Sequence, residues 1–121
     1  MKTFKEQFVS YEIALAMKEL GFDEECLGYY RNDSKSLFIG EDSRVQKDSI
    51  QSPLLQQCID WFREKHNLHI AIKTEYNGTF IITIYNMNRP QKANQSFYQY
   101  NTYQEAREQA ILKAIELCKN K

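Results

Sequence analysis

The side chains of this sequence that could bind a metal ion are two histidines and three cysteines. His66 and His69 lie three residues apart, but they fall at the predicted junction of a helix and a strand, where helical spacing no longer brings both rings to one side. No cysteine is close to either histidine in the sequence, and no CxxC pair occurs. We therefore expect no metal site and no cofactor, with both imidazoles exposed to water.

The three cysteines are weak candidates for nucleophilic catalysis. Cys58 and Cys118 occupy apolar positions of predicted helices, where a thiol behaves as a small hydrophobic group. Cys26 follows the acidic run 23–25, and nearby carboxylates raise the pKa of a thiol and lower its reactivity. Phosphate-binding glycine loops and the GxSxG and HExxH motifs do not occur in the sequence. These features predict a protein that is not an enzyme, and a small enzyme with dispersed catalytic residues ranks third among the functions considered.

One cation lies at an unexpected place. Arg107 falls within the apolar arc of the last predicted helix, between Tyr103, Ala110 and Ala114. In one interpretation its aliphatic stem packs on the core and the guanidinium reaches water near the start of the helix. In the other, the guanidinium contacts an anion or a partner. The first is favoured, because a buried charge without a partner is costly.

Length and composition predict one soluble domain. The 121 residues are 42% hydrophobic and 26% charged, ordinary values for a globular protein. Sixteen Lys and Arg balance sixteen Asp and Glu, which argues against the strongly basic surface of many nucleic-acid-binding domains. The sequence has no apolar run of about 20 residues that could span a bilayer, no secretory start, and only three widely spaced cysteines. We expect a cytoplasmic protein that has no membrane partner.

The first predicted helix covers residues 10–20. Ser10 is a suitable N-cap, and Gly21 suits the left-handed position that ends a helix. The apolar stripe at helical spacing consists of Val9, Ile13, Ala16, Met17 and Leu20. A second stripe would form if the helix began earlier, and it could mediate self-association; it consists of Phe4, Phe8, Tyr11 and Leu15. Residues 4–8 are equally well interpreted as a strand or an arm.

Residues 27–30 and 36–39 have short strand-like patterns, and 32–34 between them is typical of a turn. Residues 40–52 are polar and are predicted to form an exposed connection. A helix then follows, with Ser52 as its N-cap and Pro53 at its first position. Asn67 can end this helix in the left-handed conformation. Its apolar face consists of Leu54, Leu55, Cys58, Ile59, Trp61 and Phe62.

A hairpin is predicted after this helix, and its register depends on the turn. A two-residue Asn77-Gly78 loop would mix apolar and charged side chains on each face. A three-residue loop with Gly78 as a bulge instead gives one apolar and one polar face, which favours this register. It aligns Ile70, Ile72 and Thr74 with Phe80, Ile82 and Ile84.

A third strand over 96–101 and a last helix complete the chain. Thr102 and Glu105 form a capping box at the start of that helix, whose apolar stripe is Tyr103, Ala106, Ala110, Ile111, Ala114, Leu117 and Cys118. The predicted fold is α+β, with an antiparallel sheet and helices mainly on one face. The prediction is one domain over 1–121, formed by a segment 1–51 and an α-β-β-β-α unit over 52–121.

The polar face of the predicted sheet is the candidate binding surface. It displays His69, Lys73, Thr83 and Tyr85, and the third strand adds either Tyr98 and Tyr100 or Phe97. Such a face can stack nucleic-acid bases, or form a protein interface, in which tyrosine is enriched. It can also be covered by residues 1–50, which is the favoured interpretation for part of the face. Together with Arg107, the residues Lys73, Thr83, Tyr85, Tyr98 and Tyr100 form the candidate binding set.

Two resemblances add to these predictions. The order α-β-β-β-α from Ser52 to Cys118 resembles a double-stranded RNA-binding domain, although the run Thr102-Tyr-Gln-Glu-Ala-Arg107 lacks the lysine-rich helix start of that family. The helical runs 10–22, 53–69 and 103–114 resemble small uncharacterised proteins of bacterial and prophage-type genes. The leading prediction is a non-enzymatic binding or adaptor module of phage or mobile-element type. It would bind an unknown protein partner or a second copy. A nucleic-acid-binding domain is the alternative.

Overall fold

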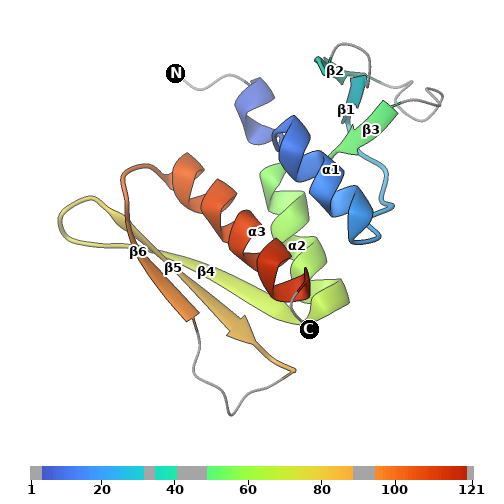
Figure 1. Ribbon diagram of the computed structural model, residues 1–121. Helices are drawn as coiled ribbons and strands as arrows, with labels where there is room; N and C mark the ends of the chain where they lie inside the picture. The colour runs from blue at the N-terminus through green and yellow to red at the C-terminus, as the bar shows by residue number, and fades with distance from the viewer. Residues whose placement is uncertain (1–3, 32–34, 41–48, 89–94, 120–121) are drawn as a thin grey trace. The chain divides into compact units, whose positions relative to one another are not determined.

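A computed structural model describes residues 4–31, 35–40, 49–88 and 95–119, without the side chains of 4, 5 and 95–99. The fold is α+β, as predicted, with helices and two antiparallel three-stranded sheets (Figure 1). The chain divides into two compact units, Met1–Gln57 and Cys58–Lys121, and each unit contains one of the sheets. No helix among the described residues is long and apolar enough to cross a membrane.

The first unit contains a short 3₁₀ helix, one α-helix and three short strands. Along the chain these elements are η1 (Phe4–Gln7), α1 (Tyr11–Glu19), β1 (Gly28–Arg31), β2 (Leu37–Ile39) and β3 (Ser49–Ser52). The strand order is β2-β1-β3, so β1 is central and both of its neighbours are antiparallel to it. The predicted strands at 27–30 and 36–39 are therefore confirmed. The predicted turn at 32–34 lies outside the described residues.

Helix α1 has the predicted ends. The Ile13 amide donates to the Ser10 hydroxyl at 3.3 Å, which satisfies one free donor of the first turn. Gly21 has a φ of 99°, and the Phe22 amide donates to the Met17 carbonyl at 3.0 Å, which closes the last turn. Val9, Ile13 and Met17 are buried as predicted, and Ala14 is buried with them.

The longer first helix, which would have joined Phe4 and Phe8 to Tyr11 and Leu15 in one stripe, does not form. η1 ends at Gln7, and Phe8 pairs with Leu54 in an isolated antiparallel bridge. The Val9 amide donates to the Pro53 carbonyl at 3.1 Å. The backbone at 8–9 is therefore bonded to a distant segment, and Ser10 starts a separate helix.

Two predictions around residue 50 are wrong. Ser49–Ser52 is a strand, β3, and not part of an exposed connection, because the buried Ile50 and Ser52 alternate with half-buried neighbours along its length. Ser52 is not an N-cap: its hydroxyl donates to the Val9 carbonyl at 3.3 Å. The predicted connection at 41–48 lies outside the described residues.

Helix α2 (Leu55–His66) begins after a different cap. The Leu54 amide donates to the Gln57 side-chain oxygen at 3.4 Å, which is the second half of a capping box without its first half. Asn67 ends the helix with a φ of 54°, as predicted. The predicted apolar face is buried at Leu55, Cys58, Ile59, Trp61 and Phe62.

The hairpin of the second unit has the predicted register. β4 (Leu68–Thr74) and β5 (Phe80–Asn86) pair Ile70 with Ile84, Ile72 with Ile82 and Thr74 with Phe80. Gly78 has a φ of 86°, and its amide donates to the Glu75 carbonyl at 3.0 Å. The Glu75 amide in turn donates to the Thr79 carbonyl at 2.8 Å, so the loop has three residues and ends in a glycine bulge.

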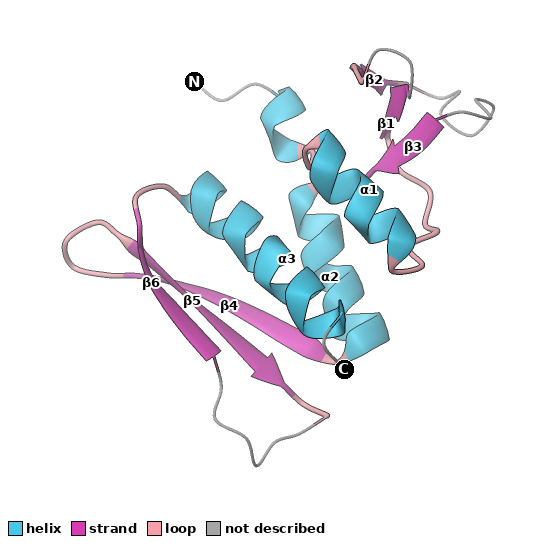
Figure 2. Ribbon diagram, viewed as in Figure 1, coloured by secondary structure: helices cyan, strands magenta, loops and turns pink. Residues whose placement is uncertain are grey.

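The third strand and last helix complete this unit (Figure 2). β6 (Gln95–Tyr100) pairs with β5 and has a register shift opposite the stretch from Phe80 to Ile82. α3 (Tyr103–Lys119) begins with the predicted cap, because the Glu105 amide donates to the Thr102 hydroxyl at 3.0 Å. It packs on β4, β5 and β6 through a buried face of Ala106, Ala110, Ile111, Ala114 and Ile115. The alanines keep the helix close to the sheet.

Candidate functional site

The sheet of the first unit presents aromatic and aliphatic side chains outward. Tyr29 pairs with Phe38 on β2 and with Gln51 on β3, so these three residues share one face. Leu27 directly precedes β1 and lies two residues before Tyr29, so it is on the same side as Tyr29. The Leu27 carbonyl accepts a hydrogen bond from the Gly40 amide at 3.0 Å. We call Leu27, Tyr29 and Phe38 the aromatic face.

The aromatic face is exposed and ordered by ring contacts. Leu27 is 58% exposed and Phe38 is 39% exposed. The Tyr29 and Phe38 rings stack with centroids 5.6 Å apart and planes 20° apart. The Arg31 guanidinium carbon lies 5.8 Å from the centroid of the Phe38 ring, a cation–π distance. Exposed apolar groups of this kind are common at interaction surfaces.

The opposite face of the same sheet packs against the core of the first unit. The Tyr30 hydroxyl donates to the Val9 carbonyl at 2.6 Å, and burial raises the pKa of Tyr30. A Cβ added to Gly28 would lie 2.9 Å from the Phe8 ring, so this strand sits directly on that ring. These contacts fix which face of the sheet points outward.

The polar face of the second sheet carries part of the predicted binding surface. His69 pairs with Tyr85, Ala71 with Thr83 and Lys73 with Ile81, so all of these occupy one face of the β4–β5 ladder. Lys73 is exposed, Tyr85 is 40% exposed, and Thr83 is half-buried. The structure thus brings Lys73, Thr83 and Tyr85 together as predicted.

The third strand does not add its predicted tyrosine to that face. Tyr100 pairs with Phe80, and Phe97 pairs with Ile82, so both occupy register positions of the apolar face. The register shift inserts one residue between them, because Phe97 and Tyr100 are three apart whereas their partners are two apart. A simple alternation along the strand is therefore wrong here. The side chain of Tyr98 lies outside the described ones.

Arg107 is not part of an exposed surface either. It is 8% exposed, and its Nη2 donates to the Gln104 side-chain oxygen at 3.1 Å. Its guanidinium carbon lies 5.0 Å from the centroid of the Tyr103 ring. Tyr103 is itself exposed and contacts Phe80 ring to ring at 5.8 Å. The guanidinium is thus held by side chains of its own helix and does not extend into water.

The predicted self-association stripe is divided between core and surface. Phe8 is buried, and Leu15 is exposed on α1. Tyr11 is half-buried, with its ring 5.6 Å from Tyr30 in an edge-to-face arrangement and the Lys35 ammonium 5.4 Å from its centroid. The side chain of Phe4 lies outside the described ones. Phe8, Tyr11 and Leu15 therefore do not form one exposed face.

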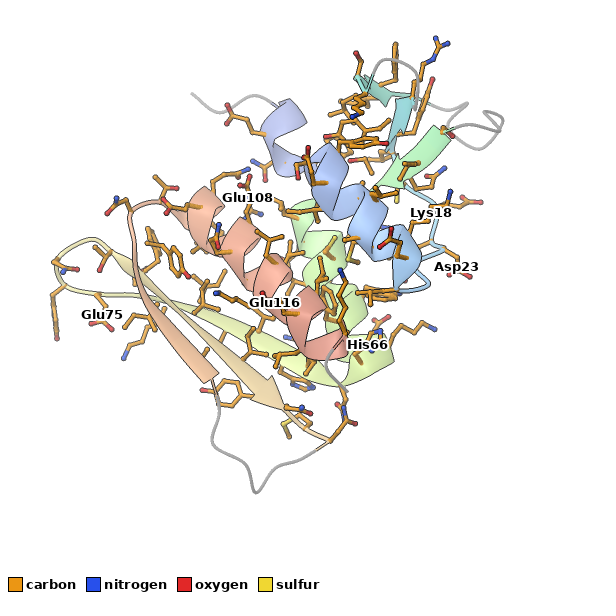
Figure 3. The ribbon with its side chains drawn as sticks, viewed as in Figure 1. Lys18, Asp23, His66, Glu75, Glu108 and Glu116 are labelled. Atoms are coloured by element: carbon orange, nitrogen blue, oxygen red, sulfur yellow. The ribbon has the colours of Figure 1, made fainter. Side chains whose placement is uncertain are left out.

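The thiols and imidazoles occupy packed positions. Burial, with a contribution from Glu24, raises the pKa of Cys26 to about 12, in the predicted direction but with burial as the larger cause. Cys58 is buried and Cys118 half-buried. The His66 ring, labelled in Figure 3, lies 4.8 Å from the Trp61 ring, and the residue is half-buried instead of fully exposed.

Sequence reasoning did not single out the aromatic face. Leu27, Tyr29 and Phe38 were visible only as parts of two short strand-like runs, and three or four residues are too few to show which face is outward. The pairing of β3 with β1 determines which side chains of β1 are exposed.

Comparisons with known proteins give no match: no protein-family model, no curated protein and no solved structure is similar to this chain. The resemblances to double-stranded RNA-binding domains and to prophage-type proteins therefore stay predictions.

Proposed function

We propose that this protein is a non-enzymatic binding module whose aromatic face docks on another protein. The observation that carries the proposal is the outward exposure of Leu27 and Phe38 beside the stacked Tyr29 ring. Buried in an interface, such side chains would lose contact with water, which is the main favourable term in protein association. Tyrosine and arginine beside them are the residue types enriched at the energetic centres of interfaces.

The chemistry of the face indicates its partner. Arg31 is the charged residue next to the Phe38 ring, and its cation–π contact places a positive charge at one end of the apolar surface. A protein surface that offers apolar side chains beside a carboxylate would complement this arrangement, because an arginine can bind a carboxylate with two hydrogen bonds.

A nucleic acid is a weaker fit to this face. One side of the Phe38 ring already contacts the Tyr29 ring, which leaves less aromatic surface on which a base could stack. The whole chain carries sixteen basic and sixteen acidic residues, so no excess of positive charge is available for phosphates.

The test is recovery of a tagged full-length chain from its native cell, compared with Leu27→Glu and Phe38→Glu variants. We expect one partner to co-purify with the wild type, to withstand nuclease and about 0.5 M salt, and to be lost from both variants by about tenfold or more. Leu112→Glu is the matched control, since Leu112 on α3 is 39% exposed, like Phe38. Equal recovery of the partner by the Leu27→Glu chain would contradict the proposal.

The polar face of the second sheet supports a second candidate function, nucleic-acid binding. Tyr85 is 40% exposed and lies opposite His69, with Lys73 on the same face. Here a base could stack on an open ring. This candidate predicts that nuclease removes the bound material, that association weakens steeply with salt, and that Tyr85→Ala reduces it. The Leu27→Glu change would then have no effect.

A further inference from the structure

A small hollow lies in the first unit between α1 and the edge strand β3. Its volume is about 120 Å³, and its lining residues are Ala14, Lys18, Phe22, Ser49, Ile50 and Gln51. β3 is an outer strand of its sheet. Three consecutive β3 residues reach the hollow although neighbouring side chains point to opposite faces, so the hollow extends to the strand edge.

The hollow exists because of two local features of the sequence. Ala14 and Lys18 are four residues apart and lie on the same side of α1, and the short alanine side chain leaves the space that a larger residue would fill. Gly21 then turns the chain in a left-handed conformation and brings Phe22 back beneath the last turn of the helix.

The walls of the hollow combine an apolar floor with one cation. Ala14, Phe22 and Ile50 are buried. Lys18 is exposed and extends from the β3 side of α1, as Figure 3 shows. Within the described ranges the Lys18 ammonium makes no ion pair and no side-chain hydrogen bond. A lysine side chain beside apolar walls complements a ligand that has a negative head and a short hydrocarbon tail.

The size of the hollow limits the ligand. A volume of about 120 Å³ has room for several water molecules. A carboxylate with a chain of two or three carbons is of this size.

One wall of the hollow is held by a hydrogen bond. The side-chain oxygen of Gln51 accepts from the Cys26 amide at 3.1 Å, which holds Gln51 in place.

We propose that the hollow between α1 and β3 binds a short aliphatic carboxylate, with the Lys18 ammonium on the carboxylate and the alkyl chain against Ala14, Phe22 and Ile50. The ligand is either a free small acid or the carboxyl terminus of a peptide that ends in a small aliphatic residue. This site is separate from the proposed docking of the aromatic face, and neither depends on the other.

The direct test titrates the isotope-labelled full-length chain with sodium butyrate and follows its amide resonances by NMR. We expect a dissociation constant on the order of 1 mM, because six non-hydrogen atoms supply limited affinity. The resonances that shift should be those of Ala14, Lys18, Phe22 and Ile50. Butylamine and 1-butanol have a similar chain without the negative charge and should bind about tenfold more weakly or worse.

Two variants with matched controls locate the site. Lys18→Gln should weaken butyrate binding about tenfold, since it removes a charged hydrogen-bond donor, whereas Lys65→Gln on α2 should not change it. Ala14→Leu should fill the hollow and abolish binding, whereas Ala16→Leu on the same helix should leave it intact. Thermal melting of all four variants shows that each is folded before binding is compared.

A second titration, with a peptide, distinguishes the two sources of the carboxylate. Gly-Gly-Val with a free carboxyl terminus is titrated beside its amidated form. Tenfold tighter binding of the free peptide than of butyrate identifies a chain terminus as the ligand, and equal or weaker binding identifies a free acid. No resonance shift with butyrate or the peptide up to about 50 mM, or binding unchanged in both Lys18→Gln and Ala14→Leu, would overturn the proposal.

Discussion

The two sheets of this protein use opposite arrangements of apolar residues. The strands of β4-β5-β6 are six or seven residues long, and the β4–β5 ladder places Ile70, Ile82 and Ile84 on the inner face beneath α3. The strands of β2-β1-β3 have three or four residues and carry apolar side chains on both faces. The sheet that comes first along the chain thus exposes the aromatic face, while the longer sheet mainly supports a core.

This difference decides what a sequence pattern can reveal. In the long hairpin, three alternate pairs on the inner face have to satisfy one register, and only the glycine-bulge loop does so. In the short sheet β1 forms three pairs with β2 and four with β3, so each face of a ladder has only one or two pairs and the constraint is weak. Outward exposure in the first sheet follows only from the packing of Tyr30 and Gly28 against the N-terminal segment.

The largest effect is expected in the core of the longer sheet. Ile82→Ala should lower the free energy of unfolding by about 2–4 kcal/mol, because a fully buried side chain is removed and leaves a cavity. Leu27→Ala in the other sheet should change it by less than about 0.5 kcal/mol, since Leu27 is mostly exposed. Urea denaturation measures the free energy of unfolding of both variants. Equal losses of unfolding free energy in the two variants would contradict this difference between the sheets.

The next effect concerns the inner face of the short sheet. Gly28→Ala should destabilise the protein by about 1–3 kcal/mol, because the new Cβ meets the buried Phe8 ring at 2.9 Å. Gly40→Ala is the matched control, since a Cβ there meets no atom within 4 Å. If the melting temperatures of the two variants coincide, the close packing of β1 on Phe8 is wrong.

A smaller effect is expected at the hairpin loop of the long sheet. Gly78→Ala should cost about 1 kcal/mol, because a φ of 86° is unfavourable for a residue with a Cβ. The space around Gly78 is open, so the cost arises from backbone conformation alone. The same Gly40→Ala control applies, and an unchanged urea midpoint would argue against the three-residue loop.

The smallest effect is chemical and leaves the fold intact. With a pKa of about 12, only about one Cys26 thiol in ten thousand is ionised near pH 8, so alkylation should be slow and should accelerate as the pH rises toward 12. The half-buried Cys118 should react first. Mass spectrometry of peptides after iodoacetamide treatment measures the order, and fast labelling of Cys26 near pH 8 would contradict its burial.

Much of the fold follows from the sequence, and the reasons are local. Ser10, Gly21, Asn67 and Thr102 mark helix ends through their own backbone preferences and hydrogen bonds, all of which the structure contains. The prediction for Ser52 is wrong because a serine before a proline is typical of a helix start. Its hydroxyl instead donates to the carbonyl of Val9, which is 43 residues away. Partners so distant along the chain leave no periodic signal.

The candidate site follows less well from the sequence. The β4–β5 positions of the polar face could be assigned from alternation, whereas Tyr100 could not, because the register shift in β6 reverses its face. Arg107 could be placed in the apolar arc, but its contacts with Gln104 and Tyr103 depend on side-chain conformations that spacing does not specify. The aromatic face depends on which strands pair, so it became visible only in three dimensions.

If a protein partner covers the aromatic face, hydroxyl-radical footprinting measures that coverage directly. The tagged chain is labelled inside its native cell and again after purification, and the oxidation of single side chains is compared by mass spectrometry. We predict that Leu27 and Phe38 are several-fold less oxidised in the cell, while Leu112 and Tyr85 are oxidised equally in both samples. Equal oxidation of Leu27 and Phe38 in the two samples would contradict the proposed docking on this face.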